Sequence, residues 1–102
     1  MKPFRLATGV EGEIQSAARW YEDRREGLGE GLVLAVREAV QDLRRAPEAQ
    51  TPLGGTGAFA FRQATVHGFP YRVVFLEQDT EILIVAVAHE RQRPFYWRSR
   101  LS

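Results

Sequence analysis

The spacing of hydrophobic residues divides the chain into a helical first half and a strand-rich second half. Between residues 10 and 45, apolar side chains recur every three or four positions, which is the period of an amphipathic helix. One such stripe predicts a helix that ends near Arg25, and a second predicts a helix from Glu30 to Arg45. The stripe residues are Val10, Ile14, Ala17, Ala18 and Tyr21 in the first helix and Leu32, Val33, Val36, Val40 and Leu43 in the second.

The ends of both helices carry sequence signals. Thr8 followed by Glu11 is a capping-box pattern, in which the threonine hydroxyl and the glutamate carboxylate each accept a backbone N–H at the start of a helix. The segment Gly27-Leu28-Gly29 predicts a left-handed C-cap and a tight turn, and Pro47 prevents continuation of the second helix. Because the linker is so short, the two helices are predicted to form an antiparallel hairpin.

From residue 58 onward, apolar and polar residues alternate as in the strands of a sheet. Three runs rich in β-branched and aromatic residues, 58–66, 71–77 and 81–88, predict an antiparallel meander, and a weakly alternating run at 4–8 predicts a short first strand. The third run is aliphatic on both faces, as a covered strand would be. Residues 47–57, rich in Pro, Gly and Thr, are predicted to be a loop. This order of elements predicts a two-layer α+β domain with the helical hairpin over one sheet face.

Composition limits the class of protein. We expect one domain over residues 1–102, because a single core typically serves about 100–150 residues. The chain has no cysteine, and its two histidines lack metal-ligand spacing, so no disulfide, metal or cofactor is expected. The first residues lack the apolar stretch of a signal peptide. The longest aliphatic run, 82–88, is shorter than the ~20 residues of a membrane-spanning helix. We therefore expect a soluble, cytoplasmic protein that does not bind membranes.

The last part of the chain combines basic and aromatic residues directly after the third predicted strand of the meander. The overall formal charge is only +1, but the stretch from His89 onward carries four arginines against a single acid, Glu90. Arginine keeps its charge and binds phosphate or carboxylate groups with two parallel hydrogen bonds. Pro94 is expected to turn the chain, and the three aromatic residues after it to pin a short helical turn onto the sheet. This pattern predicts a positive rim that suits an anionic or acidic partner.

Three segments resemble the RelE/ParE superfamily of bacterial toxins, especially its ParE-like plasmid-stabilisation branch. They are ARWYEDRREGLGEGLVLAVREAVQDLRRAP at 18–47, FPYRVVF at 69–75 and VAVAHERQRPFYWRSR at 85–100. Their order and spacing extend over nearly the whole chain. The resemblance implies the toxin of a type II toxin–antitoxin pair, with the α+β fold described above. It also implies a cognate antitoxin as partner, a hetero-oligomer with it, and growth arrest when the toxin is made alone.

The superfamily resemblance implies two different targets. ParE-like members are understood to poison DNA gyrase by binding, whereas the ribonuclease branch cleaves mRNA at the ribosome without a metal. If this chain is a ribonuclease, His89, Tyr96 and Arg62 are the catalytic candidates, although a hydrogen bond at a strand end is the simpler role for His89. Residues 53–62 carry one cation where mRNA-cleaving members are rich in lysine, so we favour gyrase inhibition. A non-toxic remnant that only binds an antitoxin is a further alternative.

Two groups of residues are assigned to partner binding. The target-binding candidates are Arg72, Arg91, Arg93, Arg98 and Arg100. Antitoxin contact is assigned to Trp20 and Trp97, with a disordered antitoxin segment folding over the helical hairpin and the sheet edge. The alternative for these tryptophans is packing within the domain. The sequence leaves open whether Arg62 and Arg72 share a face of the sheet with Arg91.

Overall fold

The computed structural model describes residues 1–56 and 59–101, and its elements follow the predicted order. A short strand β1 (Phe4–Leu6) precedes two long helices, α1 (Val10–Arg24) and α2 (Leu28–Arg45). The short 3-10 helix η1 (Pro47–Ala49) leads into the strands β2 (Thr51–Thr56), β3 (Phe59–Thr65), β4 (Tyr71–Glu77) and β5 (Ile82–His89). The last element is a second 3-10 helix, η2 (Tyr96–Leu101). Within the described ranges, no helix has the length and apolar character needed to cross a membrane.

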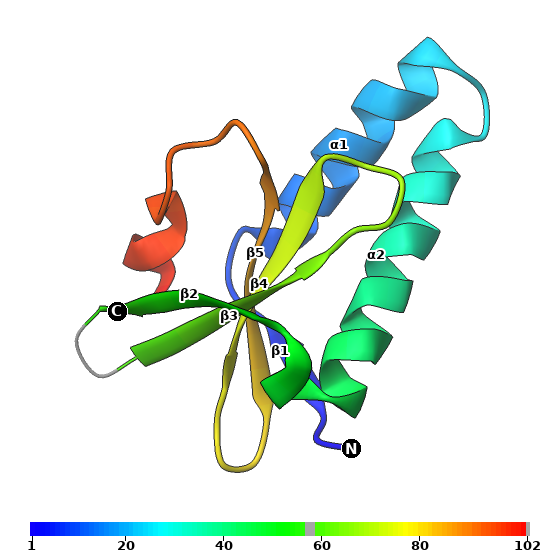
Figure 1. Ribbon diagram of the computed structural model, residues 1–102. Helices are drawn as coiled ribbons and strands as arrows, with labels where there is room; N and C mark the ends of the chain where they lie inside the picture. Colours follow the sequence, from blue (N-terminus) through cyan, green and yellow to red (C-terminus); the bar gives the residue numbers. More distant parts are fainter. Residues whose placement is uncertain (57–58, 102) are drawn as a thin grey trace.

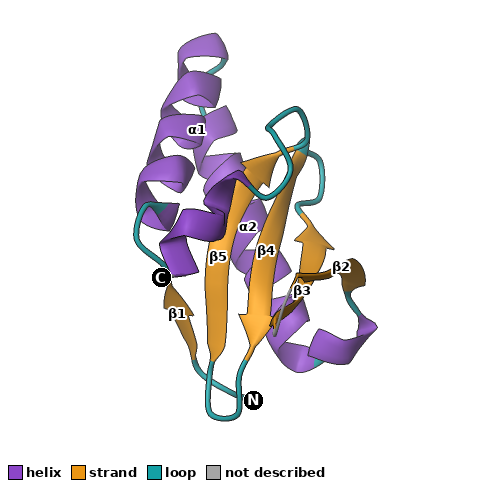
Figure 2. Cartoon of the chain, turned by 90° about the vertical axis from the view of Figure 1, so that its left-hand side faces the viewer, coloured by secondary structure: helices purple, strands orange, loops and turns teal. Residues whose placement is uncertain are grey.

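The five strands form one sheet in the order β1-β5-β4-β3-β2. Strands β2 to β5 pair antiparallel with their neighbours, whereas β1 lies parallel to β5 and pairs only with residues 82–84. The two long helices cover one face of the sheet, and η2 lies against the other (Figures 1 and 2). The predicted α+β class, with a short first strand, a helical hairpin and a C-terminal helical turn, is therefore confirmed.

The core lies between the helical hairpin and the central strands. Most of the predicted apolar stripe of α2 is buried, and Leu32 and Leu43 are fully so, whereas Val33 is half-buried. On β5, six consecutive residues from Ile82 to Val87 are buried. The helices cover one side of this strand and η2 the other, which explains why its sequence is aliphatic on both faces.

The start of α1 differs from the prediction. The helix begins at Val10 after Gly9, which has a left-handed φ of 94°, and no side chain caps it. Thr8 therefore does not form the predicted capping box with Glu11. Strand β1 ends at Leu6 rather than at residue 8, because the chain must leave the sheet and turn through the glycine before the helix can start.

The turn between the helices contains the predicted left-handed glycine. Gly27 has a φ of 87° and immediately precedes α2, which starts at Leu28. The Glu22 carboxylate of α1 accepts the N–H groups of Gly27 at 2.9 Å and Gly29 at 3.0 Å, so it satisfies two backbone donors at the start of α2. The helices approach so closely here that a Cβ on Gly29 would lie 2.4 Å from the carbonyl oxygen of Ala18.

A further strand, β2, occupies most of the segment predicted to be a loop. Residues 51–56 pair antiparallel with β3, although the register shifts between Pro52 and Gly54 and Gly54 has a positive φ of 85°. Proline and glycine are rare inside central strands but are tolerated at edges and bulges. The composition that indicated a loop is thus that of an irregular edge strand. Residues 57 and 58, at the predicted boundary between loop and strand, lie outside the described residues.

Candidate functional site

The segment that follows β5, here called the C-terminal arm (residues 90–101), is fixed to the sheet by aromatic packing. Trp97 is only 3% exposed, and its ring centroid lies 4.7 Å from that of Phe61 on β3 and 5.4 Å from that of Phe95. Burial of a tryptophan side chain removes a large apolar area from water. The prediction that these aromatic residues pin a helical turn onto the sheet is confirmed.

A second attachment of the arm is polar and is centred on Glu13 of α1. Its Oε1 accepts the N–H of Val87 at 3.0 Å and Nη1 of Arg100 at 2.9 Å. Its Oε2 accepts Nη2 of Arg100 at 3.0 Å and the hydroxyl of Tyr96. The side chains of Glu13 and Arg100 are 17% and 19% exposed, so the ion pair is largely shielded from water. One carboxylate thus joins α1, β5 and η2.

This network occupies the part of the β5 edge that β1 does not cover. Besides the Val87 N–H bound by Glu13, the Val85 carbonyl accepts Nη1 of Arg100 at 3.0 Å, and Oε1 of Gln92 accepts the His89 N–H at 2.8 Å. Backbone groups on a sheet edge bind other strands if they are left free. Side chains therefore close this stretch of β5 against strand addition.

The surroundings of the network raise the pKa of two titratable groups, Tyr96 and Arg100. Burial and the hydrogen bond to Glu13 raise the pKa of the Tyr96 hydroxyl far above its usual value. The hydrogen bond to Glu13 also raises the pKa of the Arg100 guanidinium. Tyr96 is therefore a neutral hydrogen-bond donor and Arg100 a permanent cation at physiological pH.

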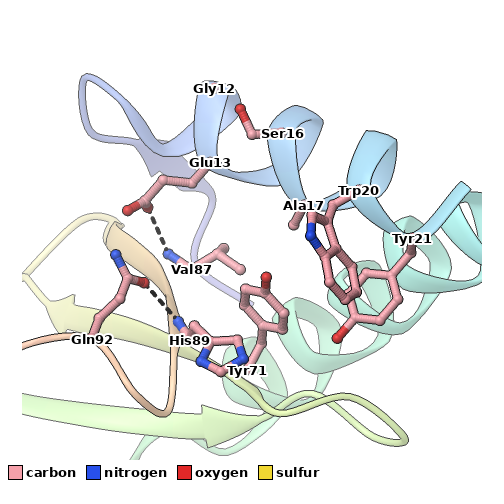
Figure 3. A pocket seen from close by; sticks show the side chains of 10 residues that line it. All are labelled: Gly12, Glu13, Ser16, Ala17, Trp20, Tyr21, Tyr71, Val87, His89 and Gln92. Atoms are coloured by element: carbon pink, nitrogen blue, oxygen red, sulfur yellow. Dashed lines mark hydrogen bonds between the residues drawn. The ribbon is translucent and has the colours of Figure 1, made fainter. Parts of the chain in front are cut away.

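A cleft with a volume of about 660 Å³ separates α1 from the end of β5 (Figure 3). Its walls include Trp20 and Tyr21 from α1 and Tyr71 and His89 from the sheet. Trp20 is 51% exposed and meets the ring of Tyr21 edge-on, with 4.9 Å between centroids. Tyr21 is half-buried against the core. The Arg24 guanidinium lies 3.4 Å from the centroid of the Trp20 ring, so a cation already occupies one side of that indole.

The ring of His89 is oriented by the backbone of Arg91. Its Nδ1 accepts the N–H of Arg91 at 3.0 Å, so the neutral ring carries its proton on Nε2. Its ring meets that of Tyr71 edge-on, with 5.0 Å between centroids. A general base needs a nitrogen with a free lone pair, and here the Nδ1 lone pair is engaged. The strand-end hydrogen bond expected for His89 is present.

Strand register decides which arginines share a face. Residues directly opposite each other in a ladder project to the same side of the sheet. Arg72 pairs with Ala88, and its neighbours on that face lead to Phe61, which contacts η2. Arg62 pairs with Phe75, one position out of phase, and therefore projects toward the helices, where its Nη1 donates to the Gln50 carbonyl at 2.9 Å. Arg62 and Arg72 thus lie on opposite faces.

Arg72 and Arg93 line one depression, here called the basic hollow, on the face opposite the helices. Its volume is about 180 Å³, and its walls come from β2, β3, β4, the end of β5 and the C-terminal arm. Arg72, Arg91, Arg93 and Arg98 are all exposed. Among the residues that the structure describes, no carboxylate oxygen lies within 4.0 Å of a side-chain nitrogen of these arginines. The one acid of its lining, Glu90, forms no ion pair with these arginines, so the hollow keeps a net positive charge.

The predicted site residues are only partly brought together. His89 and Tyr96 line the basic hollow with Arg72 and Arg93, but Arg62 is on the other face, so the ribonuclease candidates do not form one cluster. Arg100, one of the target-binding candidates, is instead bound to Glu13 because the arm folds back onto α1.

The two tryptophans assigned to antitoxin contact differ in accessibility. Trp20 is exposed beside the cleft, whereas Trp97 is buried and in this conformation packs within the domain.

Glu13 is the central residue that the sequence analysis did not identify. It lies between apolar positions of α1 and resembles an ordinary solvent-facing acid of a first helical turn. Its partners are 74 to 87 residues away along the chain, so no local pattern reveals them. One sequence feature could have identified Glu13: it is next to Ile14, in the stripe of α1 that faces the sheet.

An apolar groove lies beside β1, on the side of the sheet that carries the helices. Phe4 and Leu6 are 42% and 37% exposed along it, and the floor comes from α1 and α2. Its volume is about 340 Å³. The cations beside it are Arg37, which lines the groove, and Arg44, whose guanidinium lies 5.2 Å from the Phe4 ring centroid. We call it the β1 groove.

No group of three or more potential metal ligands occurs within residues 1–56 and 59–101.

The chain matches the sequence model of a family described as "ParE toxin of type II toxin-antitoxin system, parDE" over residues 4–94. No curated protein matches it. Among solved structures, a chain described as "Chromosomal ParDE TA system from P. aeruginosa" is similar, with a TM-score of 0.74 at 14% identity. The superposition covers 87% of this chain and 96% of that chain, and at this identity it shows the fold alone.

Proposed function

The chain belongs to the ParE toxin family of type II toxin–antitoxin systems, and we propose that it arrests growth by binding DNA gyrase in the cytoplasm until a cognate antitoxin neutralises it. Such a pair would serve plasmid stabilisation. The observation that carries this proposal is the basic hollow, where Arg72 and Arg93 are exposed and unpaired within the described chain. Guanidinium groups of this kind bind phosphates and carboxylates of another macromolecule.

Supercoiling of relaxed plasmid by purified gyrase tests this function. The wild-type protein is expected to inhibit supercoiling and to trap a gyrase–DNA cleavage complex. Arg72→Glu and Arg93→Glu should weaken inhibition by about tenfold or more, because each reverses a charge at the contact. Arg25→Glu, an equal change of charge at the exposed end of α1, is the matched control. Normal supercoiling and no trapped complex with wild-type protein would refute the proposal.

The alternative is a metal-free endoribonuclease that cuts mRNA at the ribosome. It is favoured by one observation: His89 and Tyr96 line the basic hollow together with Arg72 and Arg93. Against it, the Tyr96 hydroxyl is committed to Glu13 and the His89 Nδ1 to a backbone N–H. Cleaved transcripts on induction that disappear in His89→Ala would establish the alternative.

Induction of the wild-type protein without growth arrest would instead favour a non-toxic remnant that only binds an antitoxin.

The β1 groove is the surface we propose for the antitoxin. It combines exposed apolar side chains with a cationic border, which suits an antitoxin segment carrying apolar and acidic residues. Trp20, on the same helical hairpin, is the proposed second contact. Leu6→Glu should weaken binding of the antitoxin encoded beside this gene by about tenfold, as measured by calorimetry, and leave gyrase inhibition unchanged. Glu48→Gln, an exposed position in η1, is the control. Unchanged affinity in Leu6→Glu would exclude the groove.

A further inference from the structure

We propose that Glu13 is a positioning residue, which holds the C-terminal arm against β5 and thereby places Arg93 beside Arg72 in the basic hollow. The inference rests on the proposed role of those arginines in target binding. Glu13 itself is on α1, is largely shielded, and does not line the hollow. Its effect on the target would therefore be indirect.

Glu13 is suited to this role because its bonds are directional. Trp97 packs into the core through apolar contacts, which favour burial but do not select one orientation of the arm. The Glu13–Arg100 pair has two parallel N–H···O bonds, and Tyr96 adds a third bond from the preceding turn of η2. Bidentate arginine–carboxylate pairs fix geometry as well as adding energy. The carboxylate also accepts the Val87 N–H, so the same group that binds the arm is itself fixed to β5.

Loss of the Glu13 carboxylate charge would leave two shielded groups, the Arg100 guanidinium and the Tyr96 hydroxyl, without their charged partner. Arg100 would remain a cation at a position that is 19% exposed, and the Tyr96 hydroxyl would lose a charged acceptor. Shielded polar groups without partners are costly, and a shielded unpaired charge more so. Movement of η2 toward solvent would relieve both groups at once. Separation of the arm from β5 is therefore the expected response.

Such a movement would reach the basic hollow directly. The arm contributes Arg93, Pro94 and Phe95 to its walls, whereas Arg72 belongs to β4 in the centre of the sheet. If the arm moves, Arg93 moves and Arg72 does not. The spacing of the two guanidinium groups that a target would contact thus depends on a carboxylate outside the contact.

The test uses Trp97 as a reporter of arm position. In a Trp20→Phe background, which leaves Trp97 as the one tryptophan of the sequence, Glu13→Gln should shift its emission to longer wavelength and increase its quenching by acrylamide. In an otherwise wild-type background, Glu13→Gln should weaken gyrase inhibition by about tenfold or more, as expected for loss of charge-assisted hydrogen bonds. Glu11→Gln, an exposed acid two residues away on the same helix, should change neither measurement.

If circular dichroism shows that the Glu13→Gln protein is unfolded, two further variants test the inference. Tyr96→Phe removes one hydroxyl, and Arg100→Lys keeps the charge but not the bidentate geometry, so both should shift the Trp97 emission and weaken inhibition to a smaller degree. An unshifted emission in these folded variants would overturn the inference, as would a shifted emission with full inhibition. If wild-type protein does not inhibit gyrase, the proposed function fails, while the Trp97 emission still decides whether Glu13 holds the arm.

Discussion

Replacing Gly29 with alanine should destabilise the protein, although the same substitution stabilises most helices. Alanine is favoured over glycine inside a helix by about 1 kcal/mol. At this position, however, the new Cβ would lie 2.4 Å from the carbonyl oxygen of Ala18 and 3.1 Å from Cβ of Glu22. The oxygen belongs to the backbone of α1, so it cannot rotate away and the helices must separate.

The structure offers two internal controls for this effect. A Cβ on Gly31, in the same helix, would meet only Cζ of Phe69, at 3.9 Å, and a Cβ on Gly12, in α1, would meet nothing within 4 Å. Gly31→Ala and Gly12→Ala should therefore raise the free energy of unfolding by up to about 1 kcal/mol. Overpacking costs about 1–3 kcal/mol, and an approach of 2.4 Å to a backbone oxygen belongs in the upper half of that range. After the helix gain of about 1 kcal/mol is subtracted, Gly29→Ala should lower the free energy of unfolding by about 1–2 kcal/mol.

Urea denaturation at constant pH, monitored by circular dichroism, measures these changes in the free energy of unfolding. A loss of 1 kcal/mol corresponds to a fall in Tm of roughly 4–8 °C in a domain of about this size. The prediction is the difference in sign between Gly29→Ala and its two controls, which requires only that the overpacking cost at Gly29 exceed the helix gain of about 1 kcal/mol. A Gly29→Ala protein as stable as the wild type would show that the hairpin adapts, and the reasoning from close helix contact would be wrong.

Two further predictions concern the C-terminal arm and can be measured with the same denaturation assay. Trp97→Ala should lower the free energy of unfolding by about 3–5 kcal/mol, because the ring is buried, whereas Trp20→Ala at an exposed position should cost about 1 kcal/mol or less; equal losses would contradict the assignment of Trp97 to the core. Stability should also fall as pH rises above about 10, the unfolded pKa of tyrosine, because burial raises the pKa of Tyr96 and Tyr71 in the folded state and only the unfolded chain then releases those protons. The slope is at most about 1.4 kcal/mol per pH unit for each tyrosine, less after solvent screening, and Tyr96→Phe should make it shallower; an unchanged slope would refute the linkage.

Much of the fold could be predicted because its signals are local. The stripes of α1 and α2, the alternation of the three strands and the left-handed turn at Gly27 each depend on neighbouring residues. The errors arose where tertiary contacts overrode composition. Segment 51–56 pairs as an edge strand in spite of Pro52 and Gly54, because the bulge places them where the ladder tolerates them. Thr8 does not cap α1 because Gly9 turns the chain into the helix.

The candidate site was less predictable than the fold. The clustering of arginines after His89 was visible in the sequence, and Arg72 and Arg93 do line one hollow. Strand register, which the sequence did not specify, placed Arg62 on the opposite face. The arm binds Glu13 of α1, which removes Arg100 from the exposed set, and it packs on the sheet, which buries Trp97.

Local sequence patterns were enough to predict the order and type of most elements, the covered character of β5, and the basic and aromatic character of the segment after it. These properties follow from residue periodicity and composition, which act over a few positions. Two features could be seen only in the folded chain: Glu13 binds Arg100, 87 residues away, and Arg72 faces away from Arg62. The physical reason is that pairing and burial depend on which distant segments share a face, and that information belongs to strand register and packing rather than to any local stretch of the chain.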